Sequence, residues 1–208
     1  MSLSGYKDLN PIHLDVLTEV GNIGSGNASA ALSNLINKNV EVEMPHVKIV
    51  SFQEAMDQLP GGAEQVVAGT MTRMSGGMEG MILLLMDRDF VNTVIKSFFG
   101  HDVNNLLDLS EDEDSALTEV GNIMSGAYVS AVGQLSGLEV KLESPGFHID
   151  MMGALMSVPV IEFGEVGDEL LYIDKTLSID GKRMNTKLFL IPTIESLQKL
   201  MRELGIEV

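Results

Sequence analysis

The sequence contains nearly the same ten-residue segment twice, and this repeat constrains the fold more than any other feature. Residues 17–26 read LTEVGNIGSG, and residues 117–126 read LTEVGNIMSG, 100 positions later. Such internal similarity at a fixed offset is typical of a duplicated structural unit. We therefore expect two equivalent units, each built around one copy of the segment.

Both copies are predicted to lie in amphipathic helices. Apolar or small residues recur at three- and four-residue steps and form one face. Opposite that face, each copy carries an acid and an amide one helical turn apart, Glu19 with Asn22 and Glu119 with Asn122. In one helix such a pair could simply be solvated, but its duplication favours a shared function. The apolar faces comprise Leu14, Leu17, Val20, Gly24, Ala28, Ala31 and Leu35 in the first copy and Leu117, Val120, Met124, Tyr128, Ala131 and Leu135 in the second.

The patterns around the repeat predict the same order of elements in both halves. Each long helix, 11–37 or 111–136, leads to an extended segment that a proline interrupts 23 positions after the asparagine. The expected strands are 64–74 and 80–86 in the first half and about 157–163, 169–178 and 184–191 in the second, with a turn at Asp180–Gly181 and shorter helices at 51–62, 88–99 and 193–204.

From this order we expect one α/β (α+β) domain covering residues 1–208, made of internal repeats at about 11–100 and 111–205. The repeats would share a mixed or antiparallel sheet about a pseudo-twofold axis, with both long helices packed on one face, because this arrangement covers the strand edges. Residues 1–10 are expected to form a loose leader.

Composition excludes several functional classes. The net charge of −17 would repel phosphate backbones, so we expect no nucleic-acid partner. The chain has no cysteine, and therefore no disulfide framework or thiolate site. Apolar runs such as Met81–Met86 are too short to cross a bilayer, and the first ten residues lack the apolar core of a signal peptide. We expect a cytoplasmic protein without membrane insertion.

The remaining candidate chemistry is a carboxylate beside a carboxamide. The four histidines are scattered without the spacing of metal ligands, and no nucleophile elbow or complete phosphate loop is present. An asparagine amide has both a donor and an acceptor, so it can orient a water molecule. A carboxylate can bind a lysine of a partner. These groups suffice where placing water in line with a leaving group is the difficult step, and the other catalytic groups would come from a protein substrate.

These residues resemble the signature of a known family. The pattern is an Asp or Ser, a Glu four positions later, an Asn three positions after that, and a Pro 23 positions further on. It is similar to the motif of the CheC/CheX/FliY phosphatases, and two full copies resemble the CheC type of member. The first copy matches with Asp15, Glu19, Asn22 and Pro45, and the second with Ser115, Glu119, Asn122 and Pro145.

The resemblance implies a phosphatase that hydrolyses the aspartyl phosphate of the response regulator CheY in chemotaxis. It implies that Asn22 and Asn122 orient the attacking water and that Glu19 and Glu119 contact a lysine of the regulator. No cofactor is expected on this chain, because Mg²⁺ would sit on the regulator. The deamidase CheD is a second implied partner. The small residues that flank the two pairs, expected to let a partner loop approach, are Gly21, Gly26, Gly121 and Gly126.

Two alternatives stay open on the sequence. The chain could be a non-enzymatic binding module of the same fold, such as a flagellar switch component that holds CheY. FliM resembles this fold but lacks the acid/amide motif, so the two intact pairs disfavour that alternative. The chain could also act as an adaptor that mainly sequesters CheD.

Overall fold

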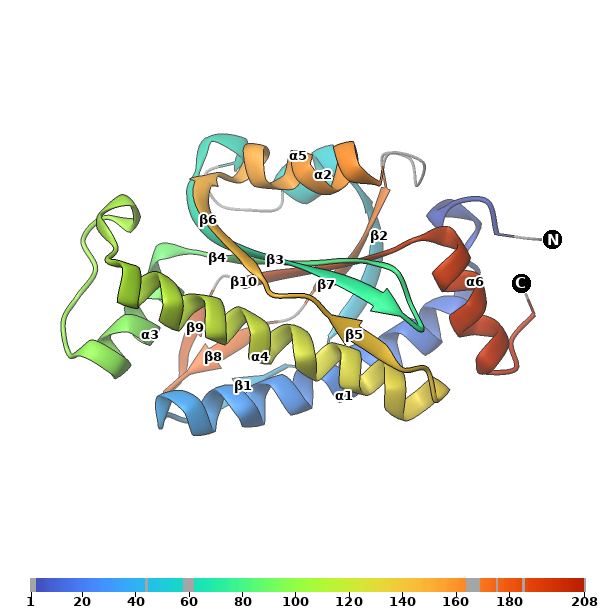
Figure 1. Ribbon diagram of the computed structural model, residues 1–208, viewed down its shortest axis with the longest axis horizontal. Helices are drawn as coiled ribbons and strands as arrows, with labels where there is room; N and C mark the ends of the chain where they lie inside the picture. The colour runs from blue at the N-terminus through green and yellow to red at the C-terminus, as the bar shows by residue number, and fades with distance from the viewer. Residues whose placement is uncertain are drawn as a thin grey trace.

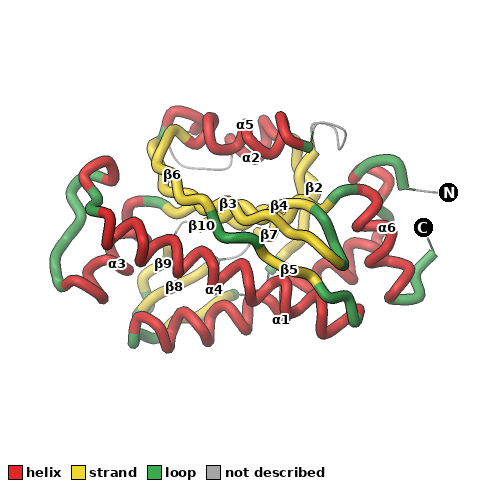
Figure 2. The backbone as a smooth tube through the Cα atoms, viewed as in Figure 1, coloured by secondary structure: helices red, strands yellow, loops and turns green. Residues whose placement is uncertain are grey.

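The structure is a computed structural model that describes residues 3–43, 45–57, 62–163, 169–174, 176–184 and 186–207 (Figure 1). A twisted antiparallel sheet occupies the middle of the molecule. The two long helices, α1 (Pro11–Ile36) and α4 (Glu111–Ser136), cover one face of the sheet, and two shorter helices, α2 (Phe52–Asp57) and α5 (Met152–Glu162), cover the other. Figure 2 shows the strands enclosed between these two helical layers. The predicted fold class and the placement of the long helices are confirmed.

The element order is similar in the two halves. In the first half α1 is followed by β1 (Val40–Val42), β2 (His46–Ser51), α2, β3 (Val66–Gly76), β4 (Gly80–Met86) and α3 (Arg88–Phe99). In the second half α4 is followed by β5 (Val140–Leu142), β6 (Gly146–Met151), α5, β7 (Glu169–Asp174), β8 (Leu177–Ile179), β9 (Lys182–Met184), β10 (Thr186–Pro192) and α6 (Ile194–Glu203). Short 3-10 turns are η1 (Tyr6–Asp8), η2 (Gly62–Glu64) and η3 (Leu106–Asp108).

The main sheet has the strand order β2-β7-β10-β4-β3-β5, and β6 also pairs with β3. All its pairings are antiparallel, and the two halves are interleaved, because β2 of the first half pairs with β7 of the second and β6 of the second half pairs with β3 of the first. At the centre, β4 pairs with β10, where Leu83 faces Phe189. Phe189 lies 106 positions after Leu83, the offset at which these two strands align in sequence. Equivalent residues of the two strands thus pair with each other, and this register supports a pseudo-twofold axis between the strands.

The central strand β4 separates two apolar clusters. Its seven residues are all buried, because alternate side chains enter opposite sides of the sheet. Ile82, Leu84 and Met86 belong to the large cluster under α1 and α4. Leu83 and Leu85 belong to a smaller cluster under α2 and α5. A continuous apolar run is therefore required here instead of the alternation of a half-exposed strand.

The long helices begin and end at the residues that the sequence indicates. Asn10 caps α1, since its Oδ1 accepts hydrogen bonds from the backbone N–H groups of Ile12 and His13. Ser110 caps α4 in a reciprocal capping box with Glu113. The helices end at Asn37 and Gly137, which both adopt the left-handed conformation. Strong local signals thus fix the helices that carry the candidate site.

Two expectations were wrong. Residues 157–163 do not form a strand, because α5 covers Met152–Glu162 and buries Met152, Leu155, Met156 and Pro159 at helical spacing. The β-branched residues in this run suggested a strand, but packing on the sheet determines the conformation.

The expected loose leader is instead packed. Leu3 and Tyr6 are buried in the main cluster, and the Tyr6 hydroxyl donates a hydrogen bond to the Pro192 carbonyl oxygen at 2.6 Å. This contact joins residues 186 positions apart, which local patterns cannot reveal. Of the expected short helix at 51–62, residues Phe52–Asp57 are helical, and 58–61 lie outside the described residues.

Helices α1 and α4 run in opposite directions and pack against each other (Figure 1). At their contact, Gly24 leaves room for the ring of Tyr128, and the hydroxyls of Ser25 and Tyr128 lie 2.8 Å apart. Burial raises the pKa of the Tyr128 phenol, so this hydroxyl stays protonated at neutral pH. Within the described part of the chain, no helix is both long enough and apolar enough to span a membrane.

Candidate functional site

Both predicted acid/amide pairs lie on the outer surface of the long helices. Glu19 and Glu119 are exposed, and Asn22 and Asn122 are partly exposed, while Val20 and Val120 between them are buried. The helical period places each glutamate one turn before its asparagine, on the side that faces neither the sheet nor the other helix. Side chains in this position are accessible to a second protein.

Within each pair the two side chains contact each other. The amide Nδ2 of Asn22 donates a hydrogen bond to Glu19 Oε2 at 3.2 Å, and that of Asn122 donates to Glu119 Oε2 at 3.4 Å. Both are long for N–H···O hydrogen bonds and lie at the surface, so each is easily exchanged for a contact with a partner. The two halves present the same local geometry.

The four flanking glycines have two different roles. Gly26 and Gly126 have open space where a Cβ would stand, which agrees with the expected approach of a partner. Gly21 and Gly121 do not, so the expectation that they flank a partner was wrong. A Cβ at Gly21 would contact Pro45 and Val47, and a Cβ at Gly121 would lie 2.3 Å from Thr70 Oγ1. Gly121 therefore lets α4 lie close to the sheet, whereas a Cβ at Gly21 would make ordinary van der Waals contacts at 3.5 Å.

The remaining motif residues are an exposed residue before each pair and a proline before an edge strand. Pro45 is buried beside Gly21 just before β2, whereas Pro145 is partly exposed just before β6. Asp15 and Ser115 are exposed one turn before the glutamates, and Ser115 Oγ donates a hydrogen bond to the Glu111 carbonyl oxygen. Pro45 therefore packs the start of β2 against α1 at Gly21.

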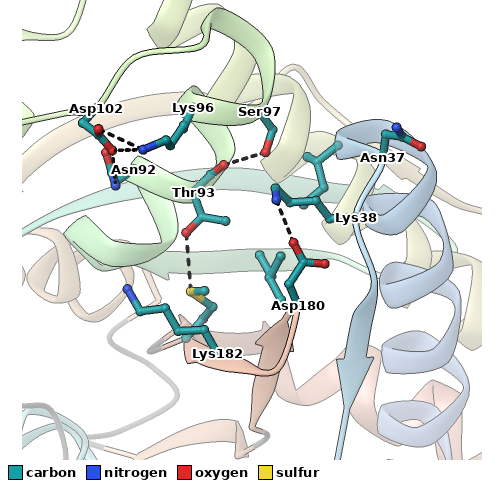
Figure 3. A pocket seen from close by; sticks show the side chains of 12 residues that line it. Asn37, Lys38, Asn92, Thr93, Lys96, Ser97, Asp102, Asp180 and Lys182 are labelled. Atoms are coloured by element: carbon teal, nitrogen blue, oxygen red, sulfur yellow. Dashed lines mark hydrogen bonds and ion pairs between the residues drawn. The ribbon is translucent and has the colours of Figure 1, made fainter.

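A cavity of about 590 Å³ lies where the end of α1 meets α3 and the β8–β9 turn, and neither acid/amide pair lines it (Figure 3). Three lysines at its rim are paired with aspartates: Lys38 with Asp180, Lys96 with Asp102, and Lys182 with Asp89. Its nearest residue on α1, Ile36, follows Asn22 by fourteen positions, about 21 Å along a helix. The cavity is thus a separate feature, and its ion pairs connect neighbouring elements.

The described residues contain no group of three or more histidine, aspartate or glutamate side chains that could hold a metal ion. The carboxylate and carboxamide groups of both pairs are at least partly exposed on the two helices. The contact that sequence reasoning missed is the one between Gly24 and Tyr128. The repeat contained a signal for this contact. Gly24 aligns with Met124 and Ala28 aligns with Tyr128, so the first copy has small residues where the second has large ones.

The fold is the one seen in solved structures of FliY and of the FliM middle domain. FliY of Thermotoga maritima has a TM-score of 0.72 to this structure at 20% identity, covering 95% of this chain and 98% of that one. The middle domain of FliM from H. pylori has a TM-score of 0.67 at 12% identity, covering 94% and 99%. At such identities the likeness concerns the fold alone.

Sequence comparison identifies the family. The model of the CheC-like family matches residues 12–49 and 113–149, which contain both acid/amide pairs and both prolines. The CheY-P phosphatase CheC of Bacillus subtilis is 32% identical over 207 residues, covering 98% of this chain and 99% of that protein. The chain belongs to the CheC-like family.

Proposed function

We propose that this member of the CheC-like family hydrolyses the aspartyl phosphate of a CheY-type response regulator and so terminates a chemotaxis signal in the cytoplasm. The observation that carries the proposal is the presence of two exposed Glu–Asn pairs in a chain similar over its whole length to the CheY-P phosphatase CheC of Bacillus subtilis. An exposed pair can reach a phosphorylated side chain only when the substrate protein docks on the helix.

In this proposal each pair completes the active site of the docked regulator. A regulator lysine binds Glu19 or Glu119, and this charge-assisted contact replaces the intrahelical hydrogen bond from the asparagine. The released amide of Asn22 or Asn122 then holds a water molecule in line with the phosphoryl group. A Mg²⁺ ion held by the regulator would supply charge neutralisation at the phosphoryl oxygens. The chain thus contributes positioning, and the regulator contributes the leaving group.

The test is phosphate release from a phosphorylated CheY-type regulator by the wild type, Asn22→Ala, Asn122→Ala and the double variant. Losing a group that positions the reacting water costs on the order of 10²-fold in rate. We expect partial activity in the single variants and a loss of about that size in the double variant. Asn34→Ala is a matched control, since Asn34 is an exposed asparagine on the same helix. Wild-type activity in the double variant would refute the proposed roles.

A second candidate function is a non-enzymatic binding module of the flagellar switch. The likeness of the fold to the FliM middle domain favours it. This candidate predicts stable binding of the phosphorylated regulator without faster loss of phosphate. The same assay, combined with a pull-down of the regulator, separates the two functions.

CheD is a further proposed partner, and it rests on the family resemblance. If the chain acted mainly as an adaptor for CheD, the Asn22→Ala, Asn122→Ala double variant would support chemotaxis in cells as well as the wild type does. A pull-down of CheD with the wild type and with the double variant, run beside the phosphatase assay, tests this alternative. We expect both proteins to capture CheD, because the two amides lie in the proposed phosphatase site.

A further inference from the structure

We propose that the chain holds two regulator molecules at the same time, one on each outer flank of the helix pair formed by α1 and α4. This inference rests on the proposed function and adds to it the stoichiometry and the independence of the two sites. A duplicated motif alone does not decide this point, because two sites placed close together on one surface would exclude each other sterically.

The direction of each pair follows from the residues that face the neighbouring helix. Gly24 of α1 and Tyr128 of α4 face each other, since a Cβ on Gly24 would lie 2.5 Å from the Tyr128 ring. At about 100° per residue, Glu19 and Asn22 project about 140° and 160° around α1 from Gly24. On α4 the same count places Glu119 and Asn122 about 180° and 120° from Tyr128. The pair on α1 therefore points away from α4, and the pair on α4 points away from α1.

The direction of the sheet gives a second constraint. Gly21 faces Val47 of β2 and Ile173 of β7, and Gly121 faces Thr70 of β3. Asn22 and Asn122 project about 100° from these glycines, and the glutamates about 160°. Each pair thus points outward and sideways, and the two directions diverge by about 100° or more.

The strand order places the two motifs over opposite sides of the sheet. In the order β2-β7-β10-β4-β3, Gly21 rests on the first two strands, and Gly121 rests on the fifth. Pro45 precedes β2 at one edge, and Pro145 precedes β6, which pairs with the outer side of β3. With strands about 4.8 Å apart, three to four spacings separate the motifs by roughly 14–19 Å.

The helix geometry gives a similar separation. Packed helices lie about 8–10 Å apart, and outward side chains add about 5 Å on each side, so the two pairs are about 20 Å apart. A compact domain of about 100 residues has a radius of gyration of about 13 Å, hence a diameter of about 34 Å. Two such domains approaching in parallel would collide. With directions about 100° apart, their centres lie about 45 Å apart, and both domains fit.

The experiment is titration calorimetry with a CheY-type regulator carrying beryllium fluoride and Mg²⁺, a stable analogue of the phosphorylated state. We expect two regulators per wild-type chain. Glu19→Lys and Glu119→Lys each repel the regulator lysine at one site, so each variant should bind one. The double variant should bind none. Glu203→Lys, an exposed charge reversal on α6 and outside both motifs, controls for the change in net charge.

The outcomes separate this inference from the function on which it rests. One regulator per wild-type chain, with one also bound by each single variant, would show steric exclusion and overturn only the inference. No binding to the wild type would overturn the proposed function as well.

Turnover gives a second readout. For simultaneous sites, the kcat of the wild type at saturating phosphorylated regulator equals the sum of the kcat values of Glu19→Lys and Glu119→Lys. For exclusive sites, it lies between those two values, which would contradict the inference.

Discussion

Gly24 on α1 lies directly against the ring of Tyr128 on α4. A Cβ at Gly24 would be 2.5 Å from Tyr128 Cδ1, closer than two carbon atoms can approach. The aligned residues of the other copy are Met124 and Ala28, which are both buried. At these two positions α1 therefore has small side chains where α4 has large ones. Within the ten-residue repeat the two copies differ only at this position, where Gly24 aligns with Met124, and close packing requires one small and one large residue at such a contact.

This exchange predicts energetic coupling between Gly24 and Tyr128. Tyr128→Ala leaves a cavity and should lower the free energy of unfolding by about 3–5 kcal/mol. Gly24→Met alone overpacks the contact and should cost about 1–3 kcal/mol. Because the new methionine fills the space of the lost ring, the double variant should be more stable than the sum of the two changes predicts, by about 1 kcal/mol or more. Urea denaturation of the four proteins measures the coupling, and strict additivity would contradict it.

The flanking glycines predict opposite effects of one substitution. Gly121→Ala places a Cβ within 2.7 Å of three Thr70 side-chain atoms, so unfolding free energy should fall by about 1–3 kcal/mol. Gly126→Ala meets open space, so higher helix propensity should stabilise the chain by up to about 1 kcal/mol. Thermal or urea unfolding compares the two variants. Thr70→Ala removes Oγ1 and Cγ2 but keeps the Cβ at 2.7 Å, so it should rescue Gly121→Ala in part. The absence of any rescue would argue against the contact.

Local sequence signals predicted the elements that carry the site. The side chains of Asn10, Ser110 and Asp87 cap α1, α4 and α3 at the predicted helix starts. The turn at Asp180–Gly181 is also confirmed, since both residues have the positive φ of a tight hairpin turn. Each of these features depends on a few neighbouring residues, which is why the sequence is sufficient to predict them.

The contacts that the sequence did not predict are long-range. Tyr6 is held by Pro192, and Gly121 faces Thr70, so neither role follows from neighbouring residues. A glycine in a helix shows that something approaches closely, but not whether it is the sheet or a partner protein. The same limit applies to residues 157–163, whose β-branched composition suggests a strand until the packing of α5 is known.

Glu113 predicts a dependence of stability on pH. Hydrogen bonds from the Ser110 backbone N–H and hydroxyl lower the pKa of this carboxyl in the folded chain. Because the folded pKa is below the unfolded value of about 4.3, the contribution is present above that pH and is lost as pH falls through the folded pKa. Glu113→Gln should therefore flatten the acid limb of a plot of unfolding free energy against pH. Asp112→Asn, an exposed change of the same charge in the same turn, should leave that limb closer to wild type.

Mg²⁺ is predicted to act from the regulator. Phosphate release should stop when the ion is chelated and return when Mg²⁺ is restored, since the acyl phosphate loses its charge neutralisation without the ion. Calorimetric titration of Mg²⁺ into the chain alone should give no binding isotherm, whereas titration into the regulator should give one. A stoichiometric Mg²⁺ site on the chain alone would contradict the proposed division of roles.

Replacing the two asparagines by aspartates tests whether the amide donor is needed. Asn22→Asp and Asn122→Asp keep the side-chain size but remove Nδ2, which donates to the glutamate in each pair. The new carboxylate lies three residues from a glutamate, so stability should fall by only about 0.2–0.5 kcal/mol per site. Activity of the double variant should fall on the order of 10²-fold if the amide orients the water. Since a protonated carboxyl can donate a hydrogen bond, the ratio of variant to wild-type activity should rise as pH is lowered. An unchanged ratio between pH 8 and pH 5 would show that the donor is not what the site requires.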